Sequence, residues 1–214
     1  MQRLRIHYAK TNAMRYTSNL DVHKIWERTL RRAKLPLAYS QGFHPQPRLT
    51  QACPLPLGLL SRAEMLDIWL ESEQDPGEVL HQLQPALPPG LEVQHIEPVD
   101  LKAPALPNQV VSSDYTALLL FGVDREQLKQ GIAGLLAAGS LPRERRGKAY
   151  DLRPYIEGLE LLPETDANGH TSLTMRLSAR ESATGRAEEV LLALGCDPFD
   201  ARIERTNLIL QTEN

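Results

Sequence analysis

Two hydrophobic periods follow one another along this chain, and their order constrains the fold more than any other feature. In residues 3–8 apolar and polar side chains alternate, which predicts a half-buried strand. From about residue 19 to residue 34 apolar side chains recur with the helical period, and Ser18 is a suitable N-cap. Pro36 disfavours helix in the residue before it, so this helix is expected to end near Lys34.

The next elements complete a β-α-β-β-α-β order. They are a proline-interrupted strand at residues 49–57, a strand at 65–71, a helix at 76–87 and a strand at 91–96. This is the split β-α-β order of ferredoxin-like folds. The order then repeats, with strands at 115–121, 171–178 and 201–210, helices at 124–138 and 185–194, and extended segments within 141–162.

The sequence therefore predicts an α+β protein of two tandem ferredoxin-like units. Residues 1–100 form the first unit, residues 101–113 a proline-containing linker, and residues 114–214 the second unit. One continuous α+β domain with a larger shared sheet is the alternative.

Hydropathy and cysteine usage restrict the cellular location that the sequence predicts. No run of 18 or more apolar residues is present, so we expect no membrane span, and the first residues show no apolar core of a signal peptide. The two cysteines, Cys53 and Cys196, are far apart and belong to no ligand pair. They favour a reducing compartment and hence a cytoplasmic location, and the sequence predicts no bound metal or cofactor.

Charge is distributed unevenly along the chain. Residues 1–64 carry eleven Lys or Arg against three acids, whereas the formal net charge of all 214 residues is −3. This asymmetry predicts an anionic partner for the first part of the chain. The alternative is that the two parts attract each other, or that the basic face is only solvated.

The first helix is amphipathic. On a helical wheel of about 100° per residue, its apolar residues fall on one arc. The opposite arc holds four cations, here called the basic ridge: Lys24, Arg28, Arg31 and Arg32. Like charges at this spacing repel each other modestly, and a bound anion would relieve the repulsion. A planar guanidinium group can donate two hydrogen bonds to phosphate oxygens, so the ridge predicts a phosphate-bearing ligand. The alternative is a helix face that is only solvated.

The segment after this helix, YSQGFHPQPR, is here called the 39–48 loop. Gly42 permits backbone angles closed to other residues, while Pro45 and Pro47 stiffen the chain. The side chains expected to stack on bases or to hydrogen-bond are Tyr39, Ser40, Gln41, Phe43, His44, Gln46 and Arg48. Such a loop beside a basic ridge suits single-stranded nucleic acid. The alternative is a structural crossover whose Phe43 fills the core, which is the preferred interpretation for Phe43 alone.

A further expectation concerns the face of the first sheet that bears no helices. In a ferredoxin-like sheet the first and third strands are neighbours. Arg3, Arg5 and His7 should therefore lie near Asp67, Trp69 and Glu71. Either cross-strand ion pairs surround an exposed aromatic ring, or this face belongs to a binding platform. Packing against the second unit would also explain Trp69.

The run from residue 14 to residue 70, which contains RTLRRAKLPLAYSQGFHPQPRLT, resembles a radical-SAM-associated bacterial family, a domain of unknown function. The likeness covers residues 3–100 well. It is weaker beyond, where RGKAYDLRPYIEGLEL is similar to the family's basic-Asp-Leu-Arg-Pro element at Lys148, Asp151, Arg153 and Pro154. Asn19 departs from the family, in which a His usually follows the residue equivalent to Ser18.

The resemblance implies an accessory or substrate-presenting role beside a cobalamin-binding radical SAM protein, and the family's gene neighbourhoods imply an RNA or ribosome connection. This chain has no C-x3-C-x2-C triplet for an iron–sulfur cluster, so it is not expected to perform the radical chemistry itself.

Three functions follow. The preferred one is a non-catalytic protein that binds or presents RNA. A second basic cluster either extends the binding surface or lies on a solvated hairpin, and its members are Arg143, Arg145, Arg146, Lys148 and Arg153. The second function is that of an RNA-cleaving or RNA-modifying enzyme that uses His44 as its acid–base group, although no carboxylate lies near it in sequence. The third is an adaptor whose basic ridge docks on the radical SAM partner.

Overall fold

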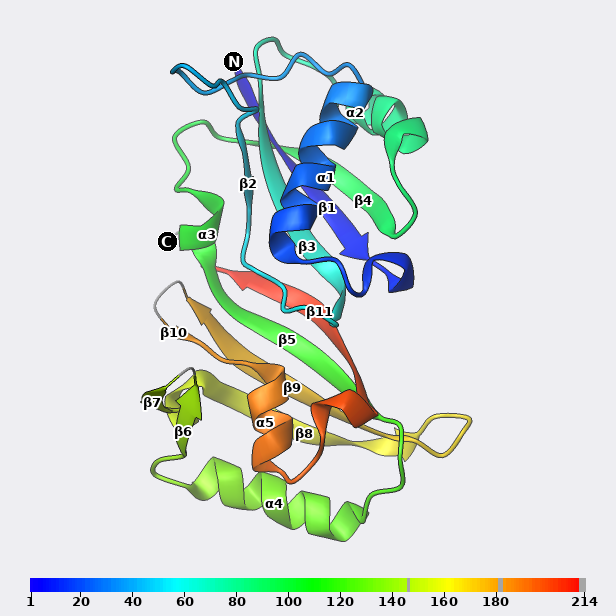
Figure 1. Cartoon of the computed structure of the whole chain (residues 1–214), viewed down its shortest axis with the longest axis vertical. Coiled ribbons are helices and arrows are strands. Elements are labelled where there is room, and N and C mark those ends of the chain that lie inside the picture. Colours follow the sequence, from blue (N-terminus) through cyan, green and yellow to red (C-terminus); the bar gives the residue numbers. More distant parts are fainter. Residues whose placement is uncertain (146, 181–182, 212–214) are drawn as a thin grey trace. The chain divides into compact units, whose positions relative to one another are not determined.

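The computed structural model describes residues 1–145, 147–180 and 183–211. The chain divides into two compact units, Met1–Val110 and Val111–Asn214, and each combines a sheet with helices (Figure 1). The protein is therefore α+β, as predicted. Residues 146, 181–182 and 212–214, which were assigned to the second unit, lie outside the described residues.

The elements of the first unit follow the predicted order. They are β1 (Gln2–Lys10), η1 (Asn12–Met14), α1 (Asn19–Arg32), β2 (Leu49–Gln51), β3 (Leu60–Leu70), α2 (Pro76–Leu83), η2 (Gln84–Ala86), β4 (Leu91–Val99) and α3 (Leu106–Gln109). Within this unit the strands pair antiparallel in the order β4-β1-β3-β2. One face of β1 packs with α1 and α2, because Leu4 and Ile6 share a buried cluster with Trp26, Leu30 and Val79.

The two ends of α1 have different causes. The Ser18 hydroxyl accepts a hydrogen bond from the backbone N–H of Asp21 at 3.2 Å, which confirms the predicted N-cap. The helix ends at Arg32, two residues earlier than expected, because Lys34 adopts a left-handed backbone conformation with φ of 57°. Within the core, the Trp26 ring packs edge-on against the Tyr8 ring with 4.9 Å between centroids.

The second unit contains β5 (Val110–Leu119), α4 (Arg125–Ala137), β6 (Pro142–Arg145), β7 (Lys148–Asp151), η3 (Arg153–Tyr155), β8 (Ile156–Thr165), β9 (Thr171–Arg180), β10 (Ala183–Thr184), α5 (Ala187–Ala193), η4 (Pro198–Asp200) and β11 (Ala201–Leu210). Here β5 lies between β9 and β11, and β8 and β10 also pair with β9. Strands β6 and β7 form a separate hairpin. On β9, Leu173, Met175 and Leu177 are buried, as their alternation predicted.

Several predicted boundaries differ from the structure. Strand β5 begins at Val110, within the expected 101–113 linker, because the β-branched pair Val110–Val111 favours extended backbone. The same stretch contains the short helix α3. Strand β2 has only three residues, since Pro54 and Pro56 cannot donate ladder hydrogen bonds beyond it. Among the described residues, no helix is long and apolar enough to cross a membrane.

Candidate nucleic-acid interface

The basic ridge lies on the solvent side of α1. Lys24, Arg28, Arg31 and Arg32 are all exposed, while Val22, Trp26, Thr29 and Leu30 of the same helix are buried. The wheel prediction is thus confirmed for both arcs. Arg32 also donates a hydrogen bond from Nη2 to the carbonyl of Ala86, so one nitrogen of its guanidinium group already has an acceptor. Arg28 and Arg31 are the two guanidinium groups best placed to receive an anion.

The end of α1 and the base of the 39–48 loop lie at the same end of the first sheet. Helix α1 runs back along β1 and therefore ends near the start of that strand. The segment that follows bridges to β3 at Leu37↔Leu70, next to the pair Gln2↔Leu70. Arg48 contacts the chain start, with its Nη1 3.5 Å from the Met1 sulfur. The topology thus brings the ridge's last turn and the loop base to one edge of the unit (Figure 1).

The 39–48 loop is closed at its base by hydrogen bonds of its own. Ser40 N–H donates to the Gln46 carbonyl at 2.8 Å, and Gln46 N–H donates to the Ser40 hydroxyl at 3.0 Å. Tyr39 also bridges to Pro47. Residues 41–46 are exposed, and Gly42 has a φ of 131° that other residues rarely adopt. These hydrogen bonds fix the base of the loop, while the polar and aromatic side chains at the loop tip face solvent.

Phe43 at the tip is fully exposed, at 102% of its reference area. The interpretation that Phe43 fills the core is therefore wrong. The hydrogen-bonded closure between Ser40 and Gln46 carries the tip away from the sheet, and the core is filled instead by Leu35, Leu37 and Leu49 on either side of the loop. His44 is also exposed, and its ring makes no hydrogen bond within the described residues.

Arg48 extends the loop toward the sheet. Its guanidinium lies over the Trp69 ring, 5.0 Å from the centroid, and Arg3 lies 5.2 Å from the same centroid. Cation–π contacts of this kind hold both groups in place. Arg48 is exposed, whereas Arg3 is buried, so only Arg48 is available to an external anion.

The helix-free face of the first sheet holds a buried ion cluster. Asp67 accepts hydrogen bonds from Arg3 Nε at 2.9 Å and from Arg5 Nε at 2.8 Å. Arg3 also donates to the carbonyls of Ala103 and Pro104 at 2.7 and 2.8 Å, so the segment before α3 covers this face. Of the two alternatives that the sequence left open, cross-strand ion pairing is confirmed, and these two arginines face inward rather than toward a ligand.

The second predicted basic group lies in the second unit. Lys148 is exposed on β7. Arg153 donates to the carbonyls of Ile156 and Leu136 at 2.9 and 2.8 Å, so its guanidinium ties η3 to the end of α4. Backbone N–H groups of Leu141 and Arg153 donate to Asp151, and these bonds lower the pKa of its carboxyl group. The Asp-Leu-Arg-Pro element thus stabilises the local structure around η3 by hydrogen bonds.

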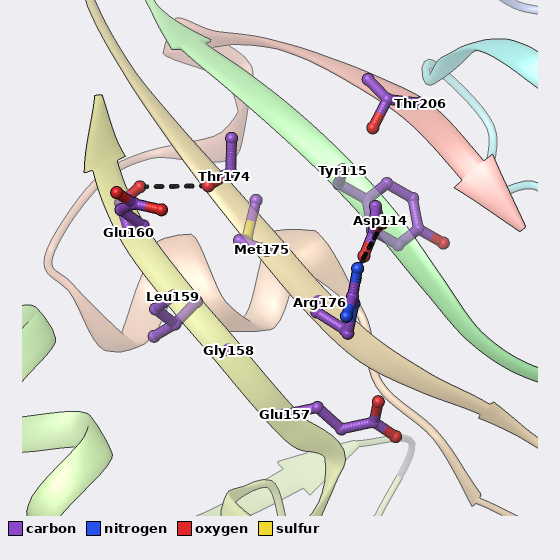
Figure 2. A pocket seen from close by; sticks show the side chains of 10 residues that line it. All are labelled: Asp114, Tyr115, Glu157, Gly158, Leu159, Glu160, Thr174, Met175, Arg176 and Thr206. Atoms are coloured by element: carbon purple, nitrogen blue, oxygen red, sulfur yellow. Dashed lines mark hydrogen bonds and ion pairs between the residues drawn. The ribbon is translucent and has the colours of Figure 1, made fainter. Parts of the chain in front are cut away.

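The second unit also has a concavity of about 420 Å³ on its sheet (Figure 2). Its polar lining includes Asp114, Glu157, Glu160 and Arg176. Arg176 makes a two-point contact with Asp114, at 2.7 and 3.0 Å, and Figure 2 shows the two side chains pointing toward each other. Three carboxylates against one paired guanidinium do not suit a polyanion. This concavity is therefore a poorer candidate for nucleic acid than the first unit.

One potential ligand group was missed in the sequence. His7 of β1 and His95 and Glu97 of β4 place their ligand atoms within 4.8 Å of one another. His7 is 88 positions from His95, so no local sequence spacing reveals the group. The sequence indicates only that His95 and Glu97, two positions apart on one strand, lie on the same face of the sheet.

A family model covers most of the sequence. Residues 3–187 match the family described as "Uncharacterized protein conserved in bacteria (DUF2344)". The chain belongs to this family. No curated protein matches the sequence.

Solved structures with a similar fold share little sequence. One chain of the "Crystal Structure of a Cbf5-Nop10-Gar1 Complex" aligns with 96% of this chain at 11% identity and a TM-score of 0.51. A chain of the "Crystal structure of the archaeal box H/ACA sRNP Nop10-Cbf5 complex" aligns with 96% at 12% identity and a TM-score of 0.48. This family member spans 48% of each of those chains, so the first likeness concerns the fold of about half of that protein.

Proposed function

We propose that this DUF2344 protein is a non-catalytic accessory protein that binds single-stranded RNA on the first unit. The observation that carries the proposal is that the basic ridge and the 39–48 loop are both exposed, and that the last turn of the ridge and the loop base lie at one edge of the unit. Phosphates would contact Lys24, Arg28, Arg31 and Arg48, while Phe43 and Tyr39 offer rings to bases. A fixed loop base lowers the entropy lost when the tip is ordered on a strand.

Phe43→Ala is expected to weaken binding of single-stranded RNA by about 5-fold to 150-fold, since stacking on one aromatic ring contributes about 1–3 kcal/mol per base. The thermal unfolding midpoint should stay unchanged, because the Phe43 side chain is fully exposed. Fluorescence anisotropy with a labelled oligonucleotide measures the affinity, and a salt series should show it falling steeply as ionic strength rises.

Phe199→Ala is the matched control, because Phe199 is 93% exposed and lies in the second unit. It should bind RNA as the wild type does. Equal weakening by both substitutions, or affinity that ignores salt, would contradict the proposed interface.

We further propose that each unit is ferredoxin-like. The antiparallel order β4-β1-β3-β2 supports this for the first unit. For the second unit the support is the order β11-β5-β9-β8, with the β6–β7 hairpin inserted between α4 and β8. Both match the strand order that a split β-α-β pair produces.

We also propose that this protein works in the cytoplasm with a radical SAM protein; the family resemblance of residues 3–100 supports the partner. Affinity purification of the tagged chain from its native host, followed by mass spectrometry, should recover a radical SAM protein. Recovery that is lost on nuclease treatment would mean that RNA bridges the two proteins, as expected for RNA presentation. Recovery that survives nuclease would instead favour direct docking, and no radical SAM protein in either sample would exclude the partnership under those conditions.

A further inference from the structure

Three metal-ligating side chains meet on the helix-free face of the first sheet. His7 on β1 is the register partner of His95 on β4, so their side chains emerge on the same face. Glu97 lies two residues beyond His95 and shares that face. The His7 Nε2 atom is 3.0 Å from a Glu97 carboxylate oxygen, and the two imidazole rings stack with 3.9 Å between centroids.

The backbone is irregular at this position. The register passes from His7↔His95 to Tyr8↔Val93, so β4 carries one extra residue, Gln94, at this step. The Gln94 side chain is held by a hydrogen bond to the Arg62 carbonyl at 2.8 Å. Bulges of this kind turn side chains away from their regular direction and occur often beside functional sites. Here the bulge immediately precedes His95.

We propose that His7, His95 and Glu97 bind a divalent transition-metal ion of the zinc class. Two imidazoles and one carboxylate are a ligand set that such ions prefer, and they leave a fourth position open to water or a ligand. Ligand atoms around a tetrahedral zinc ion lie about 3.3 Å apart, given bonds of about 2.0–2.1 Å. The three side chains already place these atoms within 4.8 Å, so the site forms when side-chain rotation turns the ligand atoms toward one ion.

The surroundings suit this role. His95 is exposed and the Glu97 side chain is 47% exposed, so both can rotate and an ion can reach them from solvent. His7 is less exposed than the other two, and its burial lowers the pKa of its imidazole. The hydrogen bond with Glu97 acts in the opposite direction but is the smaller effect. Such a site would cross-link β1 to β4, independently of RNA binding.

Titration of the full chain with Zn²⁺, followed by isothermal calorimetry, tests the proposal. One site per chain is expected, weakened at least about ten-fold in His95→Ala and in Glu97→Gln, as loss of a ligand requires. Both side chains are exposed, so the variants should fold as the wild type does. Zn²⁺ should also raise the unfolding midpoint of the wild type more than that of either variant, because it binds the folded state.

His170→Ala is the matched control. The ring of His170 lies 2.9 Å from the Asp166 carboxylate, but no third ligand accompanies this pair among the described residues. It should bind Zn²⁺ as the wild type does. Affinity in His95→Ala within about two-fold of the wild type, or a loss confined to His170→Ala, would overturn the proposal.

Discussion

Asp67→Asn is expected to lower the free energy of unfolding of the first unit by about 3–5 kcal/mol, as removal of one member of a buried ion cluster typically does. Asp67 is fully buried between Arg3 and Arg5, which are 2% and 5% exposed. Each guanidinium donates to the carboxylate at 2.9 Å or less, through Nε and Nη2 of Arg3 and Nε of Arg5. An amide carries no charge, so the substitution leaves two buried cations uncompensated.

The two tryptophans offer a direct measurement. Trp26 and Trp69 are the only tryptophans in the sequence, and both lie in the first unit. Urea unfolding followed by tryptophan fluorescence therefore reports this unit without a signal from the second. A shift of the urea midpoint with little change in slope would show that the native state lost stability.

Glu71→Gln is a suitable control, because it removes one negative charge from an exposed residue just after β3. It should have little effect on the midpoint. A triple variant, Arg3→Met with Arg5→Met and Asp67→Leu, should recover part of the loss, since an apolar replacement leaves no unpaired charge. A loss of less than about 1 kcal/mol in Asp67→Asn would indicate that water reaches the cluster.

Reversal of two ridge charges, Arg28→Glu with Arg31→Glu, is expected to weaken RNA binding by about 10-fold to 100-fold at 0.1 M salt. Each cation that contacts a phosphate contributes about 0.7–0.9 to the slope of log affinity against log salt, so the slope should fall by about 1.4–1.8 units. The fold should persist because both side chains are exposed, although an acid in the last turn of α1 opposes the helix dipole slightly.

The control for this reversal is a variant with the same change in net charge elsewhere. Lys129 and Arg202 are exposed residues of the second unit, and their replacement by Glu changes the total charge equally. RNA affinity of this variant should stay close to that of the wild type. If both double variants lost affinity alike, the protein would respond to net charge alone and the ridge would not be the interface.

Much of the first unit was predictable because it depends on local signals. Apolar alternation in β1, the Ser18 cap of α1 and the Pro-containing start of α2 each act within a few residues. The exposure of the basic ridge followed from helical periodicity alone. The early end of α1 did not, because it depends on the left-handed conformation of Lys34, which is not a residue that usually adopts it.

The candidate site was predictable only where neighbours in sequence are also neighbours in space. The preferred interpretation of Phe43 failed because the loop closes on itself between Ser40 and Gln46, a pairing that no periodicity reveals. Similarly, Arg153 has the chemistry of an anion ligand, yet its Nη1 and Nη2 atoms each donate a hydrogen bond to a backbone carbonyl. Composition indicates which groups a residue offers, and tertiary contacts determine which of those groups remain available.

The sequence alone determined the α+β class, the order of elements in the first unit, and a cationic helix face opposite an apolar one. These properties arise from the side-chain periods of strands and helices, which are local. Only the tertiary structure decided that the ion pairs of Arg3 and Arg5 with Asp67 are buried, that Phe43 faces solvent, and that His7 meets His95 across 88 positions. Strand register joins residues that are distant in sequence, and a register is fixed by the packing of the whole unit.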